Sequence, residues 1–130
     1  MGALIDGPDG EALDRDLDDV AAAYIEPGGD FLVDDVDGRI VAMGGLRPQG
    51  TRSAELKRMR VHPDWQRRGR GRAMLDALEQ RARDLGFQTL LLDTTEQQVG
   101  ARSLYTSSGY VSTGGGEFYG QTVIFMEKTL

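Results

Sequence analysis

Cysteine is absent from this sequence of 130 residues, and histidine occurs once, as His62. The absence of cysteine excludes disulfide bonds, thiolate metal sites and covalent catalysis through a cysteine thiol. His62 stands before Pro63 at the end of a strand-like run, which favours a plain turn residue over a member of a Ser-His-Asp triad. A multi-histidine metal site is excluded as well, and we expect no metal.

Long apolar runs are also absent. No run approaches the roughly 20 residues that a membrane-spanning helix needs, and the N-terminus lacks the basic-then-apolar pattern of a secretion signal. A chain of 130 residues fits one domain on the usual scale of about 100 to 200 residues. We therefore expect one domain over residues 1–130, a cytoplasmic location and no membrane partner.

Charge is distributed unevenly along the chain, although the net charge is −6. Residues 1–38 carry twelve acidic residues and one basic residue, whereas residues 52–72 carry eight basic residues and two acidic ones. The overall acidity argues against nucleic-acid binding, and the local basic cluster indicates a single anion-binding site. The acidic residues of the N-terminal third either form a solvated face or attract a cationic amine, and both interpretations stay open.

The apolar pattern predicts alternating strands and helices. Helices are expected at residues 11–24, from Arg70 to a C-cap at Gly86, and at residues 98–107. Strands are expected at residues 31–36, 39–46, 54–61 and 89–93, followed by two C-terminal strands with a flexible spot at residues 114–116 between them. The strand at 89–93 follows a helical crossover and should run parallel to 54–61. This order predicts a mixed α/β fold with a mostly antiparallel sheet flanked by helices.

The most informative segment is residues 54–75, where a half-buried strand with a bulge or kink leads through a loop into a helix. The loop Gln66-Arg67-Arg68-Gly69-Arg70-Gly71 contains two glycines, which allow a ligand to approach the main-chain amides closely. Free amides and the dipole at a helix N-terminus favour phosphate. The alternative is a solvated basic loop, but strand, loop and helix together favour a polyanion site.

Two blocks of the sequence resemble the family of GCN5-related N-acetyltransferases (GNAT). The loop from Gln66 to Gly71 matches the family signature of Gln or Arg, two residues, Gly, one residue, and Gly or Ala. The second block has the family's pattern of Asn or Gln, Ala, Leu-Tyr and Gly-Phe or Gly-Tyr, matched here by Gln98, Ala101, Leu104, Tyr105, Gly109 and Tyr110. The resemblance covers roughly residues 30–130. The family's first edge strand has one candidate here, residues 3–5. The sequence therefore leaves undecided which residues form the wall of the acceptor site.

The resemblance implies the acyl-CoA N-acyltransferase fold, with a splayed parallel strand pair, and acetyl-CoA as co-substrate. The splayed strand would bind the pantetheine arm through the backbone of Met59, Arg60 and Val61. The pyrophosphate would lie against the loop and the helix start, at Gln66, Arg67, Arg68, Gly69, Arg70, Gly71 and Arg72. Gln98 would hydrogen-bond the arm from the other side.

The resemblance also implies two catalytic residues. Glu55 lies eleven residues before Gln66, as does the general-base glutamate of the family's histone acetyltransferases, so it would take the proton of the amine. The alternative is a surface glutamate that pairs with Lys57. Tyr105 would protonate the departing coenzyme A thiolate, and the alternative is an ordinary packed tyrosine.

The sequence therefore predicts an enzyme, an N-acetyltransferase that moves acetyl from acetyl-CoA to a primary amine of a small molecule. Two alternatives stay open: a protein or peptide N-acetyltransferase, and a catalytically weak module that binds coenzyme A. Tyr24, Glu117 and Tyr119 are candidate acceptor-pocket residues, although nothing in their spacing demands that role. A homodimer is neither required nor excluded.

Overall fold

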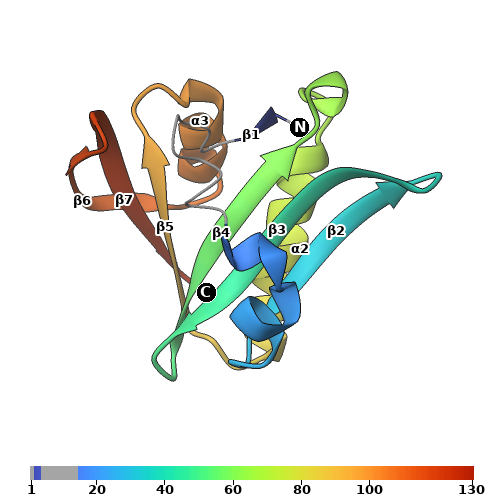
Figure 1. Ribbon diagram of the computed structural model, residues 1–130. Helices are drawn as coiled ribbons and strands as arrows, with labels where there is room; N and C mark the ends of the chain where they lie inside the picture. Colours follow the sequence, from blue (N-terminus) through green and yellow to red (C-terminus); the bar gives the residue numbers. More distant parts are fainter. Residues whose placement is uncertain (1, 4–14) are drawn as a thin grey trace.

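The computed structural model describes residues 2–3 and 15–130, and its centre is a twisted, mostly antiparallel sheet (Figure 1). The strands lie in the order β2-β3-β4-β5-β7-β6, with β1 paired beside β4. Their bounds are β1 Gly2–Ala3, β2 Asp30–Val36, β3 Arg39–Gln49, β4 Ser53–Val61, β5 Thr89–Thr95, β6 Val111–Phe118 and β7 Gln121–Thr129. Only β4 and β5 pair in parallel among these strands, so the predicted mixed α/β fold is confirmed.

Helical segments cover both faces of the sheet (Figure 1). Their bounds are η1 Arg15–Asp18, η2 Ala21–Ile25, η3 Pro63–Trp65, α2 Arg70–Asp84 and α3 Val99–Ser107. Helix α2 packs on β3, where a Cβ added to Gly44 would lie 2.6 Å from Leu78 Cδ1. Glycine therefore lets the helix approach the strand closely, and Leu78 is fully buried there. Gly86 follows α2 with a φ of 89°, as expected of a left-handed C-cap.

The β2–β3 hairpin turns at Asp37 and Gly38, as predicted. Both residues have positive φ, 53° and 83°, which is the geometry of a two-residue hairpin whose twist matches that of its strands.

None of the helices in residues 2–3 and 15–130 is long and apolar enough to cross a membrane.

Strand β4 carries the predicted bulge and then separates from β5. Arg58 has a φ of 55°, and the β3–β4 register shifts between Met43 and Gly45. Pairing between β4 and β5 is confined to three residue pairs, from Ser53 opposite Thr89 to Glu55 opposite Leu91. Beyond Glu55 the two strands diverge, and α3 lies at the open end between them (Figure 1).

Strand β1 occupies part of the edge that β5 leaves. Gly2 pairs with Val61 and Ala3 with Arg60, both antiparallel. Strand β3 already holds the other edge of β4 at the same two residues, so β1 must lie on the side of the opening. Ala3, from the candidate first strand at residues 3–5, is therefore part of a strand, which lies at the opening, and residues 4 and 5 lie outside the described residues.

The continuous helix expected at residues 11–24 is also wrong where it can be checked. Residues 11–14 lie outside the described part, and the remainder forms two short segments, the 3-10 helix η1 and the π-helix η2. Asp19 Oδ1 accepts a hydrogen bond from the Ala22 amide at 3.1 Å, which begins a new turn between them. Aspartate side chains compete with the helix for backbone donors, and this acidic segment is rich in them.

Residues 114–116 are part of β6 rather than a flexible connection between the last strands. Gly115 pairs with Ile124 of β7, and a Cβ on Gly115 would lie 2.4 Å from the Val123 carbonyl oxygen. The glycines here permit a close strand approach beside a register shift between Ser112 and Gly114.

Candidate active site

A pocket lies where β4 and β5 diverge. It is lined by Leu56, Lys57, Arg58, Met59 and Arg60 of β4, by Asp93 and Thr94 of β5, and by Tyr105 of α3. The structure thus brings predicted arm-binding residues together with the predicted acid, although they are far apart in sequence. Asp93 was not singled out from the sequence, because one aspartate at the end of an apolar strand has no distinguishing pattern.

Tyr105 is 3% exposed and closes this pocket from α3. Burial raises the pKa of its phenol, and the negative charge of Asp93 raises it further. The phenol therefore keeps its proton throughout the neutral range and can act as a hydrogen-bond or proton donor.

Glu55 lies beside the pocket, but it is not among the described residues that line it. Its Oε1 accepts a hydrogen bond from Gln49 Nε2 and lies 3.6 Å from Arg47 NH2. Its Oε2 lies 3.9 Å from Lys57 Nζ, which is the surface pairing considered above as the alternative. Three donors therefore already surround this carboxylate.

The start of α2 has the geometry of an anion site. Gly69 is the N-cap with a φ of 79°, and among the described residues no side chain caps the helix there. The first amides of a helix have no partner within the helix, so they are available to a ligand. A Cβ added to Gly71 would lie 3.4 Å from Leu104 Cδ2 and 3.6 Å from Val61 Cγ2, so this glycine faces the opening between α3 and the end of β4.

The arginines near this helix start contact protein groups. Arg70 NH1 lies 3.0 Å from Asp34 Oδ2, and its guanidinium stacks 5.1 Å from the Trp65 ring centroid. Arg68 stacks on the same ring, at 5.3 Å. Arg72 donates to Ser107 Oγ at 2.7 Å and to Ser108 Oγ at 3.2 Å.

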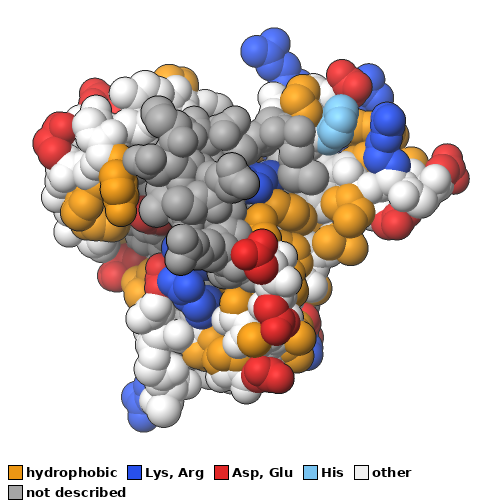
Figure 2. Space-filling model, in the orientation of Figure 1, with side chains coloured by type: hydrophobic (Ala, Val, Ile, Leu, Met, Phe, Trp, Pro, Cys, Tyr) orange, Lys and Arg blue, Asp and Glu red, His pale blue; other side chains and the backbone are white. Residues whose placement is uncertain are grey.

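These contacts hold Arg68, Arg70 and Arg72 against protein groups, while the first backbone amides of α2 have no partner within the helix and can bind an anion. Arg67 is exposed, with a φ of 61°. Figure 2 shows basic side chains beside the single histidine, at the end of the molecule where this loop lies.

Gln66 and Gln98 stabilise the two ends of the opening. Gln66 Nε2 donates to the Val61 carbonyl at 3.1 Å and ties the loop to the end of β4. Gln98 is the N-cap residue of α3, and its Oε1 accepts from Thr94 Oγ1 at 3.1 Å and from the Thr95 amide at 3.4 Å. The Gln98 amide therefore points toward β5 in this structure.

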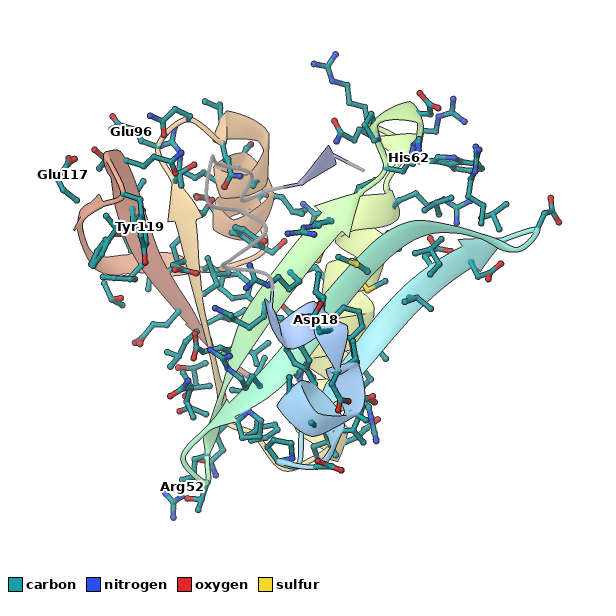
Figure 3. All side chains as sticks on the ribbon, viewed as in Figure 1. Asp18, Arg52, His62, Glu96, Glu117 and Tyr119 are labelled. Carbon is teal, nitrogen blue, oxygen red and sulfur yellow. The ribbon has the colours of Figure 1, made fainter. Side chains whose placement is uncertain are left out.

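The other candidates lie outside the pocket. Tyr24 is fully buried against Phe31, with ring centroids 5.1 Å apart. Glu117 and Tyr119 lie at the β6–β7 hairpin, across the molecule from His62 (Figure 3). His62 Nδ1 accepts from the Asp64 amide at 3.1 Å, as a turn residue would. Within the described ranges no group of three or more potential ligands could hold a metal ion.

The chain is similar in sequence to known proteins. Residues 4–110 match the model of the Acetyltransferase (GNAT) family. Human N-acetyltransferase 8 is 32% identical over 108 residues, which cover 78% of this chain and 48% of that protein. The chain thus spans about half the length of these curated relatives.

Solved structures of acetyltransferases also superpose on this chain. An acetyltransferase from Streptococcus agalactiae superposes with a TM-score of 0.84 at 20% identity, covering 92% of this chain and 78% of that one. An acetyltransferase from Salmonella typhimurium, solved with its cofactor acetyl-CoA, gives a TM-score of 0.73 at 24% identity, covering 84% and 69%. Both confirm the fold expected from the two sequence blocks.

Proposed function

The chain belongs to the GNAT family of acetyltransferases, and we propose that it moves the acetyl group of acetyl-CoA directly to a primary amine of a small molecule. The observation that carries this proposal is the buried Tyr105 in the pocket between the splayed strands, with the uncapped start of α2 at the same open end. Direct transfer agrees with the lack of cysteine, since no thiol could carry the acetyl group in between.

The residues around the opening fit acetyl-CoA. The free amides from Gly69 to Arg72 would bind its pyrophosphate, and Gly71 leaves space that a side chain would fill. The backbone of Met59, Arg60 and Val61, on the edge that β5 leaves, would pair with the amides of the pantetheine arm. Gln98 would reach the arm after its amide leaves Thr94. When bound, acetyl-CoA supplies the activated thioester.

Tyr105 is the proposed general acid. Its hydroxyl stays protonated in the neutral range because burial and Asp93 raise its pKa. In the reaction it would donate that proton to the sulfur as the carbon–sulfur bond breaks and the new amide forms.

Two carboxylates are candidates for the base that takes the proton of the amine. Glu55, the residue favoured by the resemblance, is surrounded by three donors. Asp93 lines the pocket together with Tyr105, and we favour it for that reason. Protonation of Asp93 would also remove the negative charge that raises the pKa of Tyr105, so the base step would make Tyr105 a better acid.

The pocket that Tyr105 closes is small. Its volume is about 20 Å³, little more than one water molecule needs, which favours an acceptor that brings its amine there on a slender group. A protein or peptide acceptor would have to bring its amine into the same opening from outside.

The test of function is a coenzyme A release assay over a panel of amines and amine-terminated peptides. We expect turnover with small primary amines and little with peptides of eight or more residues. Turnover confined to peptides would show that the acceptor is a protein or peptide amine and not a small molecule. Acetyl-CoA binding without turnover of any amine would favour the catalytically weak module that binds coenzyme A.

Cofactor binding is tested separately by thermal unfolding. A ligand at about 100 times its dissociation constant stabilises a protein by roughly 2.7 kcal/mol, so acetyl-CoA should raise the melting temperature by several degrees. Gly71→Glu should abolish this shift, because a carboxylate would occupy the phosphate position. Ala77→Glu, an exposed site on the same helix, is the matched control and should keep the shift. A full shift with Gly71→Glu would mean that the phosphate binds elsewhere.

A further inference from the structure

A buried charged cluster lies behind Tyr105, outside the pocket. Glu79 of α2 is 5% exposed, and both of its carboxylate oxygens have partners. Oε2 accepts from the Tyr110 hydroxyl at 2.8 Å, and Oε1 accepts from Lys128 Nζ at 2.9 Å. Lys128 Nζ also lies 5.7 Å from the centroid of the Tyr110 ring. The cluster therefore joins α2, the start of β6 and β7 around a single tyrosine.

Stability alone gives little reason for this cluster. Burying the Glu79 carboxylate costs desolvation energy that its attraction to the partly exposed Lys128 barely offsets, and well-packed apolar residues often serve a fold as well. What the cluster does achieve is orientation. The Tyr110 hydroxyl donates to a fixed acceptor, and burial together with this hydrogen bond raises its pKa, so it remains a donor.

Tyr110 in turn holds Tyr105. The two rings pack edge to face, with centroids 5.7 Å apart and an interplanar angle of 64°. The Tyr110 amide also donates to the Tyr105 carbonyl at 3.0 Å, so both the backbone and the ring of Tyr105 contact this neighbour. The two side chains are 3% and 2% exposed, which leaves little free space for either ring to turn.

We propose that Glu79 and Tyr110 are positioning residues that fix the ring of Tyr105 for proton donation. Glu79 holds the Tyr110 hydroxyl, Tyr110 holds the Tyr105 ring, and Lys128 holds the other oxygen of Glu79. Neither Glu79 nor Tyr110 is among the described residues that line the pocket, so each acts through Tyr105. This inference rests on the proposed acid role of Tyr105.

The test is a double-mutant cycle on kcat. Tyr110→Phe keeps the ring and removes only its anchor, and we expect kcat to fall by about tenfold, since small displacements of a catalytic group are costly. The dissociation constant of acetyl-CoA should change less than twofold. In a Tyr105→Phe background, Tyr110→Phe should cause no further fall in kcat. Thr113→Val, which removes a hydroxyl from an exposed residue of β6, is the control and should behave as wild type.

Each result of the cycle has a distinct meaning. A fall in kcat of equal size in both backgrounds would show a structural role for Tyr110 and overturn the inference. If Tyr105→Phe lowers kcat while Tyr110→Phe does not, the inference fails and the acid role stands. An unchanged kcat with Tyr105→Phe would remove the acid role itself, and the inference with it.

A second variant covers the case in which Tyr110→Phe does not fold, because that change leaves an oxygen of Glu79 buried without its donor. The double variant Glu79→Gln with Tyr110→Phe removes the charge as well, and it should show the same loss in kcat. The single variant Glu79→Gln keeps an acceptor for the Tyr110 hydroxyl and should lose less activity than Glu79→Ala. Equal losses with glutamine and alanine would contradict the anchoring role of Glu79.

Discussion

At the scale of single residues, the site depends on which carboxylate can accept a proton without losing a partner. Glu55 is in contact with three donor side chains, so a proton there would displace at least one of them. Asp93 lines the pocket that Tyr105 closes, and its charge already acts on the Tyr105 hydroxyl. Proton acceptance and proton donation would then occur within one pocket.

We predict that Asp93→Asn lowers kcat by about 10²- to 10⁴-fold, the usual contribution of a general base. Glu55→Gln should keep kcat within about threefold of wild type, since the amide still accepts from Gln49. The measurement is kcat and kcat/KM against pH for both variants. The reverse order of effects would return the base role to Glu55.

The two packed tyrosines predict a specific weakness at high pH. Both pKa values are raised in the folded protein, so the unfolded chain releases these protons first, near the ordinary pKa of about 10. Their contribution to stability is therefore complete below pH 10 and is lost as the pH rises above it.

Urea unfolding between pH 8 and 11 measures this effect. The free energy of unfolding should fall above pH 10, and Tyr105→Phe should reduce the slope by up to about 1.4 kcal/mol per pH unit. Tyr119→Phe is the matched control, because it removes an exposed phenol instead of a buried one. Its slope should equal that of wild type. Equal slopes for wild type and Tyr105→Phe would contradict the raised pKa of Tyr105.

Residues within a continuous motif could be predicted from the sequence, while residues that depend on distant partners could not. The loop glycines and Tyr105 belong to local patterns, and the structure places them around one opening. Asp93 gains its position only when β5 pairs with β4 and then diverges from it. Arg70 looks like a phosphate ligand in sequence, but its partner is Asp34, 36 residues earlier.

At the scale of elements, two glycines at the start of α2 are under different constraints: Gly69 has a conformational one, and Gly71 has a proposed role in cofactor binding. Gly69 has a φ of 79° with nothing within 4 Å of an added Cβ, so its constraint is purely conformational. Gly71 has no such backbone requirement, and an added Cβ would make ordinary contacts with Leu104 and Val61 in the opening.

We predict that alanine substitutions at these two glycines affect different properties, stability at Gly69 and cofactor affinity at Gly71. Gly69→Ala should lower the free energy of unfolding by about 1 kcal/mol, the cost of a left-handed conformation for a residue with a Cβ. Gly71→Ala should leave stability within about 0.5 kcal/mol of wild type but weaken acetyl-CoA binding. Urea unfolding and titration calorimetry give the two readouts. Unchanged affinity with Gly71→Ala would place the cofactor away from this helix start.

Most elements could be predicted to within a few residues, because their periodic patterns agree with their tertiary environment. The failures occur where side chains or neighbours override the pattern. Asp19 redirects the N-terminal helical turns through its own hydrogen bond. Gly115 lies within β6 because the β7 backbone approaches it too closely for a side chain, and composition alone cannot show that.

At the scale of the whole molecule, β1 and the proposed pantetheine arm require the same edge of β4. Gly2 and Ala3 pair with Val61 and Arg60, the backbone assigned to the arm. The strand must therefore leave before the arm binds, which lowers the apparent affinity by the fraction of molecules that are open. A pair of residues such as Gly2 and Ala3 carries no pattern, so sequence reasoning could not place this contact.

Deleting residues 1–3 should therefore tighten acetyl-CoA binding, by roughly three- to tenfold for so short a pairing. Adenosine 3′,5′-bisphosphate, the nucleotide fragment of coenzyme A, is the control ligand. It lacks the arm, so its affinity should be the same for both chains. Titration calorimetry measures both ligands, and equal acetyl-CoA affinities would show that β1 does not compete.

The place of β1 has a second consequence, which concerns association between copies of the chain. A strand edge with free amides and carbonyls recruits strands from other molecules, and proteins usually cover such edges. Without β1, the backbone of Arg60 and Val61 would present such an edge in the middle of the sheet. The same two residues that would compete with the cofactor arm would thus shield this edge from aggregation in the empty protein, and a bound arm would take over that protection.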